Sequence, residues 1–551
     1  MSETASGMSG LEESIDSSCL VAVAPTSESA VHRTLSAWVL SVFNLTFKIG
    51  GNVAIIPLAL RFLGRQEYGL WIILQSVGTY LTLSELGIGQ TVLNFQNVAY
   101  TKGDRQGINR ILTTVFGLYW IIIGFAWVLA AIIFLTRPVE TWFLKDGSGN
   151  RAVLFRSLVA LVGTLALLRV PLNVFPATLL GLRELTLRQY LELALAVSVV
   201  VGTIVTLLAG GRVLALILVT NVAPALVLVV AYLLARAKHP YLSLTTSFWT
   251  PSLVWPLLSN SLFFFLYGLG LLFQRLAGSV LAGKFIGLEA VPAFFVLFTL
   301  FRVVGWSLAD TISQTMQPYI IMFDVQGQRS RVEFFAQLST KITFAAAVVY
   351  SVLIWLFADV GIRVWVGRGM FLGYGPLALL AGSFLIDVLF LSTNNFMRAL
   401  NRHRGLSVIM TIYAVFSFVL GIAGAKWWMP EHPALGLCWG LFTASVLGQA
   451  LPLPWLAKEW LRHDWATYLE RFLVRPVCLG TLGAALSFGF LVIGKAGDWS
   501  RGVCATLALA LLPLATWLVA FDEREREWLR ALTIRSGIGP KSLWTVISGD
   551  R

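Results

Sequence analysis

Five basic residues lie inside stretches of sequence that are otherwise strongly apolar. They are Lys48, Arg169, Arg275, Arg302 and Lys341. A cation at the centre of a bilayer costs roughly 2.5–3.5 kcal/mol on insertion scales, so it usually faces the interior of a helix bundle or a wet cavity. An anionic partner can offset that cost. The pattern therefore predicts a pathway or a binding site for something negatively charged.

No pattern of residues indicates catalysis. The five histidines lie in loops or tails without HExxH spacing, and the chain has no P-loop sequence for binding ATP. The four cysteines are scattered, without metal-ligand or redox spacing. We therefore expect no catalytic residues, no metal and no cofactor, and we expect that the protein is not an enzyme.

The composition indicates a membrane protein. Of the 551 residues, 57% are hydrophobic and only 13% are charged. Apolar segments of about 20 residues recur, each long enough to cross roughly 30 Å of hydrocarbon. A β-barrel would show short alternating segments instead. The net charge of +13 would suggest nucleic acid for a soluble chain. Here the basic residues lie mostly in short loops, where they set orientation, so no nucleic-acid partner is expected.

The hydropathy pattern predicts an all-α fold of about fourteen transmembrane helices. The expected spans are 36–60, 69–93, 110–135, 153–178, 190–209, 213–235, 252–282, 290–318, 334–357, 374–395, 406–427, 434–457, 473–494 and 502–520. We group them as a first lobe (35–235), a second lobe (252–457) and two further helices (473–520). Residues 1–34 are expected to be a disordered tail and 521–551 a charged tail. Loops on the side of the amino terminus carry more Lys and Arg, which predicts cytoplasmic termini.

An internal repeat relates the two lobes. RFLGRQEYGLW (61–71) resembles KFIGLEAVPAF (284–294), and KGDR (102–105) resembles QGQR (326–329). An even number of spans separates the matched turns, so both halves start on the same side of the membrane. The sequence thus predicts two parallel six-helix lobes related by an axis along the membrane normal.

The segment PLALRFLGRQEYGLWIILQSVGTYLTLSELGIGQTVLNF (57–95) is similar to the opening of bacterial polysaccharide-export flippases. VPLNVFPATLLGLREL (170–185) resembles the end of their fourth helix. Glu85 stands where that family commonly has Asp. These flippases belong to the multidrug/oligosaccharidyl-lipid/polysaccharide (MOP) superfamily. The resemblance covers about residues 35–520 and implies a V-shaped, two-lobed transporter in the bacterial inner membrane. It also implies an undecaprenyl-diphosphate-linked oligosaccharide as substrate.

The embedded charges would then line a central cavity. We expect Lys48, Arg275 and Arg302 to contact the substrate, and Glu85, Asp310, Asp387 and Arg169 to serve in gating or coupling. Each residue has a structural alternative. Lys48 could form an ion pair within the first lobe, and Arg302 could pair with Asp387 rather than with a ligand. Arg169 could satisfy a carbonyl freed beside Pro171.

Three functions remain open at this point. The leading one is a flippase that moves a lipid-linked glycan by alternating access, with membrane lipids, a polysaccharide polymerase and other assembly proteins as partners. A proton or sodium gradient would drive it, since no ATP site is present. The second is a multidrug cation antiporter, which would favour intramembrane acids over bases. The third is a membrane glycosyltransferase or ligase, which usually has a large outer loop, whereas the longest one here spans only about 136–152.

Overall fold

The computed structural model describes residues 28–81, 87–136, 138, 140–143, 150–182, 184–400, 404–461, 465–493 and 498–527. In this part of the chain, eleven helices are long and apolar enough to cross a membrane. The number is twelve if the bent pair Pro251–Ser259 and Ser261–Gln274 forms one span. The expected all-helical, multi-pass membrane fold is confirmed. The number of helices is lower than fourteen partly because the first two expected spans merge into one kinked helix.

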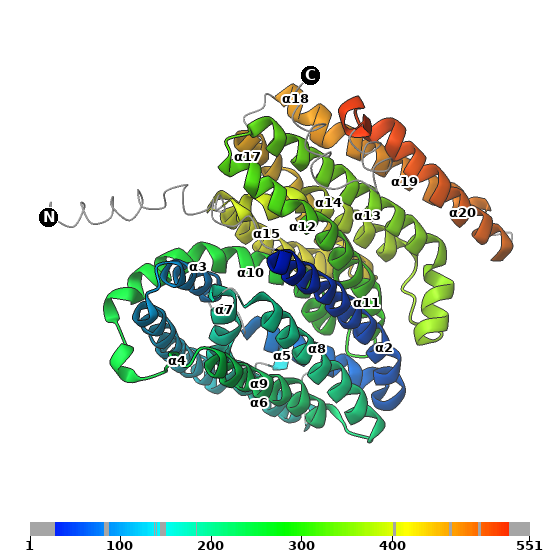
Figure 1. Ribbon diagram of the computed structural model, residues 1–551. Helices are drawn as coiled ribbons and strands as arrows, with labels where there is room; N and C mark the ends of the chain where they lie inside the picture. Colours follow the sequence, from blue (N-terminus) through cyan, green and yellow to red (C-terminus); the bar gives the residue numbers. More distant parts are fainter. Residues whose placement is uncertain are drawn as a thin grey trace.

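The first half of the chain forms one bundle, drawn from blue to green in Figure 1. Its helices are α2 (Glu28–Leu81), α3 (Ile88–Thr101), α4 (Arg105–Thr136), α5 (Glu140–Phe143), α6 (Asn150–Arg169), α7 (Val174–Gly181), α8 (Leu185–Leu208) and α9 (Val213–Lys238). The first helix begins at Glu28, within the segment expected to be a tail. It bends at Gly64, whose φ of 73° is left-handed and favours glycine.

The second half forms the other bundle, and α2 runs between the two (Figure 1). Its helices are α10 (Val254–Phe285), α11 (Val291–Thr299), α12 (Trp306–Val325), α13 (Arg329–Val366), α14 (Tyr374–Ala399), α15 (Arg404–Ala423), α16 (Pro433–Ser445) and α17 (Pro452–Leu461). The chain ends with α18 (Trp465–Tyr468), α19 (Arg475–Ile493) and α20 (Asp498–Ala515). The last two of these pack on α13, outside the two bundles.

The predicted repeat is visible in the backbone of the matched turns. Gly64 and its counterpart Gly287 both have positive φ, 73° and 98°. Gly103 and Gly327 have φ of 69° and 68°. The hydrogen bonds after these two glycines also correspond, because in each turn the Arg amide donates to the Gly carbonyl at 3.0 Å. The two halves of the chain therefore fold these turns in the same way.

At one end of the molecule the two bundles bond directly to each other. We call it the closed end, and it comprises residues 61–69, 284–290 and 363–373. Gln66 donates a hydrogen bond of 2.5 Å to Glu289. Arg65 donates one of 3.1 Å to the carbonyl oxygen of Arg368. Each bond joins the first half of the chain to the second.

The backbones also approach closely near this end. A Cβ added to Gly69 would lie 2.2 Å from the carbonyl oxygen of Leu288, so only glycine fits there. The indole nitrogen of Trp365 donates to the carbonyl oxygen of Val53 at 2.8 Å. These contacts make the closed end a packed joint as well as a hydrogen-bonded one.

The connection between the bundles is anchored to the first half. Lys238 and His239 lie 2.5 and 3.0 Å from the carboxylate of Glu184. Burial alone would raise the pKa of Glu184, but the hydrogen bonds and charges of these two partners outweigh it and hold that pKa below its ordinary value. Further along, the amide of Ser243 donates to Asn109 in α4 at 3.1 Å. The linker therefore belongs to the first bundle.

Candidate anion-binding and gating residues

Lys48 lies in α2, sixteen residues before the kink at Gly64, which is about 24 Å along a helix axis. Its ammonium group forms an ion pair of 2.8 Å with Glu192 in α8. The side chain of Lys48 nevertheless remains 45% exposed inside a membrane-spanning segment. Because an exposed cation is costly against hydrocarbon, this face of α2 is suited to a wet space rather than to lipid.

A second cation shares the same carboxylate. Arg188, in the first turn of α8, lies 2.5 Å from Glu192, four residues on. The Nε and Nη1 atoms of Arg188 are buried and have no hydrogen-bond partner among the described residues. Buried donors of this kind are usually satisfied by water or by a ligand. Lys48, Arg188 and Glu192 therefore form a triad with one excess positive charge.

Sequence reasoning did not select Arg188, because it was assigned to a loop. The usable signal was its spacing from Glu192, since residues four apart lie on the same face of a helix. The contact with Lys48 joins residues 144 positions apart and leaves no local pattern.

Arg302 is neutralised inside the second bundle. It pairs with Asp387 in α14, and their side chains are 2% and 0% exposed. Arg302 also donates to Ser383 in the same helix, and Gln449 donates to Asp387 at 2.5 Å. Of the two partners that the sequence left open for Arg302, the structure shows the protein carboxylate. In this conformation both charges of the pair are buried inside the bundle.

The pair belongs to a buried polar network with unusual backbone around it. Ser383 bonds to Ser445 at 2.6 Å, and Tyr413 bonds to Ser445 at 3.2 Å. Arg302 lies in a π-helical segment, Leu300–Gly305, and Gln449 lies in another, Val446–Ala450. Single π-helical turns in longer helices occur frequently at functional sites. The network links α14, α15 and α16 to the segment between α11 and α12.

Asp310 in α12 forms a separate cluster. Its carboxylate accepts from Asn395 at 2.9 Å and from Gln314 at 2.7 Å. Asn395 in turn accepts from Arg398 at 2.5 Å, and the guanidinium of Arg398 lies 4.8 Å from the ring centroid of Tyr267. Asp310 is half-buried and Gln314 is exposed, so the carboxylate is more accessible than Asp387. Asp310 is not the partner of Arg302, which pairs with Asp387.

Lys341 also has a buried partner, in the segment expected to be a tail. Its ammonium group lies 2.9 and 2.7 Å from the two carboxylate oxygens of Glu525, and both side chains are almost fully buried. Asp522 and Glu525 cap each other: each backbone amide donates to the other side chain, at 2.8 and 2.9 Å. This reciprocal arrangement is a capping box. Residues 521–527 are thus docked on the second bundle.

Three other expected site residues are less fully described. Glu85 lies outside the described residues, as does the side chain of Arg275. Arg169 is half-buried at the end of α6, directly before a short 3₁₀ helix that contains Pro171, and it makes contacts within the protein. No group of three or more metal-binding side chains occurs in the described part of the chain.

The fold is similar to that of several solved transporters. No family profile and no curated protein sequence matches the chain. An inward-facing MATE-family multidrug resistance transporter of the MOP superfamily matches with a TM-score of 0.53 and 15% identity, over 77% of this chain and 94% of that one. The lipid II flippase MurJ, in an inward closed conformation, matches with a TM-score of 0.54 and 12% identity, over 87% and 97%.

The chain therefore has a MATE- and MurJ-like fold. A transporter of the MOP superfamily from Pyrococcus furiosus is also similar, with a TM-score of 0.50 and 14% identity over 78% of this chain and 96% of that one. At such identities the likeness concerns architecture alone. The two-lobed MOP-like fold expected from the sequence is therefore confirmed, whereas membership of the polysaccharide-export family is a matter for proposal.

Proposed function

We propose that the protein is a flippase that moves an undecaprenyl-diphosphate-linked oligosaccharide across the bacterial inner membrane for the assembly of an exopolysaccharide, a capsule or an O-antigen. One observation carries the proposal: Lys48 is an exposed cation in a membrane-spanning helix, beside an arginine with unfilled donors. Such a site is suited to a diphosphate or to an acidic sugar.

The chemistry of the triad fits this substrate. A lipid-linked glycan crosses a bilayer slowly because its charged, hydrated head must enter hydrocarbon. Lys48 offers a point charge, and the guanidinium of Arg188 offers free N–H groups that can bind phosphate oxygens. Glu192 lies between the two cations and holds them in place. The prenyl chain could remain in lipid while the head occupies the wet space between the lobes.

Arg302 takes a different role in this proposal. Removing it from Asp387 would leave a buried carboxylate without its cationic partner, which costs about 3–5 kcal/mol. We propose that the pair organises the second lobe, and that Lys48 and Arg188 contact the substrate. Arg275, a basic residue in an apolar segment, remains a candidate contact.

If the termini are cytoplasmic, the conformation is inward-facing. The closed end then faces the periplasm, and the molecule is arranged to receive substrate from the cytoplasmic side. Transport requires the lobes to rock so that the bond between Gln66 and Glu289 breaks. Asp310 is the accessible acid that could couple this motion to a proton or sodium gradient.

The second candidate is a multidrug cation antiporter. The half-buried carboxylate of Asp310 and the similarity to a MATE-family transporter favour it. The excess positive charge of the Lys48 triad disfavours the binding of a cationic substrate, because like charges repel. Drug resistance of a deletion strain distinguishes the two functions.

The test of the leading proposal is the lipid-linked glycan content of a deletion strain. We expect one undecaprenyl-diphosphate oligosaccharide to accumulate in the cytoplasmic leaflet, with loss of one surface polysaccharide. The chain supplied in trans should reverse both changes. An unchanged glycan profile together with new sensitivity to cationic drugs would favour the antiporter instead.

A further inference from the structure

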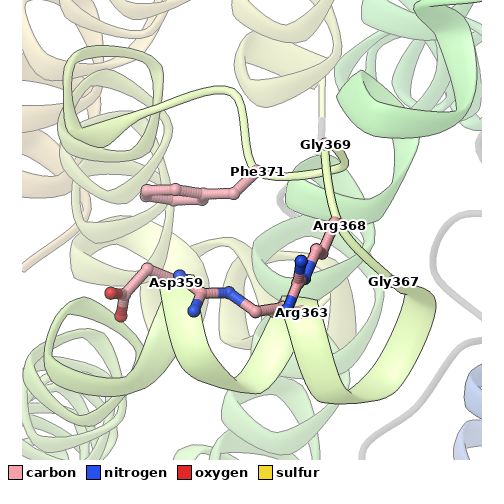
Figure 2. Close-up of a pocket in the computed structure, with 6 residues that line it drawn as sticks. All are labelled: Asp359, Arg363, Gly367, Arg368, Gly369 and Phe371. Carbon is pink, nitrogen blue, oxygen red and sulfur yellow. The ribbon is translucent and has the colours of Figure 1, made fainter.

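A pocket of about 350 Å³ opens at the closed end, in the second half of the chain. It lies where α13 ends and the loop towards α14 begins. Its lining residues are Asp359, Arg363, Gly367, Arg368, Gly369 and Phe371. Figure 2 shows the side chains of Arg363 and Arg368 between the helix and the loop, with the ring of Phe371 above them. The pocket is separate from the Lys48 triad and from the Arg302 network.

The charges around this pocket are mainly positive. Two guanidinium groups and one carboxylate line it. A third guanidinium, that of Arg65 in α2, lies against the pocket wall: it binds the carbonyl oxygen of Arg368 and lies 3.2 Å from where a Cβ of Gly369 would be. Three neighbouring cations repel one another, and an anion bound among them relieves that repulsion. The planar fork of arginine binds phosphate and carboxylate groups bidentately.

The backbone of the loop keeps the pocket open. Gly367 and Gly369 have backbone φ angles of 97° and 80°, which residues other than glycine rarely adopt. These turns let the loop fold back over the end of α13 and carry Arg368 towards Arg363. The volume lies within the range of about 300–1,000 Å³ that is usual for small-molecule sites, so a phosphate or a sugar acid fits.

We propose that this pocket binds an oxyanion, either a phosphate or a carboxylate group, and that the bound anion stabilises the closed end. The link to conformation is Arg65, which comes from the first half of the chain and holds the Arg368 loop only while the two bundles are in contact. A ligand shifts a conformational equilibrium by its difference in affinity for the two states. The anion therefore binds more tightly to the closed form and favours it in return.

Two sources could supply this oxyanion. The pocket lies at the end of a membrane-spanning helix, where arginines reach the phosphates of lipid headgroups. A soluble phosphate or an acidic sugar offers the same chemistry. The two sources differ in whether the effect follows the composition of the bilayer or of the buffer.

Spin labels can measure the closed population in the full-length protein. Cysteines would replace Leu214, at the start of α9, and Val364, near the end of α13, after removal of the native cysteines. Both positions are well exposed, at 53% and 81%. Distances between the labels would be recorded in phosphatidylcholine nanodiscs with increasing inorganic phosphate, and in nanodiscs that contain phosphatidylglycerol without phosphate.

We expect the short-distance population to rise with phosphate, with phosphatidylglycerol, or with both. A rise with phosphate identifies a soluble oxyanion, and a rise with phosphatidylglycerol alone identifies a lipid headgroup. Arg368→Gln keeps the carbonyl that Arg65 binds but removes one guanidinium, so it should weaken the apparent affinity about tenfold or more. In the Arg65→Gln variant, addition of the ligand should no longer increase the closed population.

Arg156→Gln is the matched control. This residue lies in α6 of the first bundle, against the ring of Phe134, and its loss changes the net charge by the same amount. It should behave as the wild type does. The proposal is overturned if neither phosphate nor phosphatidylglycerol changes the distances, or if Arg368→Gln responds as fully as Arg156→Gln.

Discussion

Gln66 donates a hydrogen bond to Glu289, its own counterpart in the internal repeat 223 positions further along the chain. The two residues occupy the same place in the matched turns after Gly64 and Gly287, so the contact lies where the two halves of the repeat meet. A bond on a pseudo-symmetry axis is well placed to control whether the two lobes stay together. We propose that the closed end is one side of the gate.

This position predicts an effect on conformation. Gln66→Ala removes a hydrogen bond to a charged group, so the closed population should fall several-fold, for a loss of about 1 kcal/mol at an exposed site. The distance between labels at positions 214 and 364 measures it. Gln75→Ala, which removes a hydrogen bond within the first bundle, is the control. An equal shift in both variants would mean that Gln66 has no special role.

The pairing of Arg302 with Asp387 predicts strong non-additivity. Asp387→Asn leaves a buried cation and should destabilise the protein by about 3–5 kcal/mol, whereas Arg302→Met with Asp387→Leu should recover most of that loss. The loss and recovery of stability can be measured as the thermal unfolding midpoint in detergent and as the protein level in the membrane. If the double variant is stable but inactive in glycan export, the pair has a role in transport beyond stability.

The charge-exchanged pair, Arg302→Asp with Asp387→Arg, sharpens this test. Recovery of both protein level and export would establish a purely structural pair. If the single substitution Arg302→Lys restores only part of the activity lost in Arg302→Ala, the bidentate fork of arginine matters.

The ion pair between Lys341 and Glu525 predicts that the start of the expected tail is needed for stability. Glu525→Gln leaves the buried Lys341 with a weaker partner and should lower the thermal midpoint by several degrees, whereas the exposed Glu523→Gln should not. Truncation after Glu527 should be tolerated, and truncation after Ala520 should not. Equal stability of the two truncated proteins would contradict the role of the capping box.

Orientation can be tested with single cysteines at the two ends of the bundle. Lys102 is exposed beside Gly103, at the end opposite Gly64, and Arg212 is 82% exposed near the closed end. If the amino terminus is cytoplasmic, an impermeant maleimide added to intact cells should label position 212 and leave position 102 unlabelled. The reverse pattern would invert the proposed direction of transport.

The sequence predicted the helices and the repeat because both leave local patterns. Apolar stretches of the right length mark the spans, and glycines that must adopt positive φ mark the matched turns. It also identified Asp387 as one potential partner of Arg302, because few acids lie in the membrane-spanning segments.

The remaining contacts of the site could not be read from the sequence. Lys48 and Glu192 are 144 positions apart, and Lys341 and Glu525 are 184 apart. Such pairs depend on which helix faces meet, and hydropathy does not encode that. A capping-box sequence, Asp522-x-x-Glu525, was present as a local sign that the chain remains ordered beyond the last span. It gave no indication that Lys341 would be the partner of Glu525.

The central claim is that the exposed charge of Lys48 serves the movement of an anionic lipid-linked glycan. The direct measurement uses proteoliposomes with a fluorescent undecaprenyl-diphosphate disaccharide, and follows the fraction of headgroups that an impermeant glycosidase reaches with time. Lys48→Ala should fold normally, because Glu192 still has Arg188 as its ion-pair partner and an exposed ion pair contributes only about 0–1 kcal/mol. We predict flipping by the wild type and by Lys426→Ala, an exposed lysine beside Trp427, and about tenfold slower flipping by Lys48→Ala. Flipping by Lys48→Ala at the wild-type rate, or by the wild type no faster than in protein-free vesicles, would contradict the account.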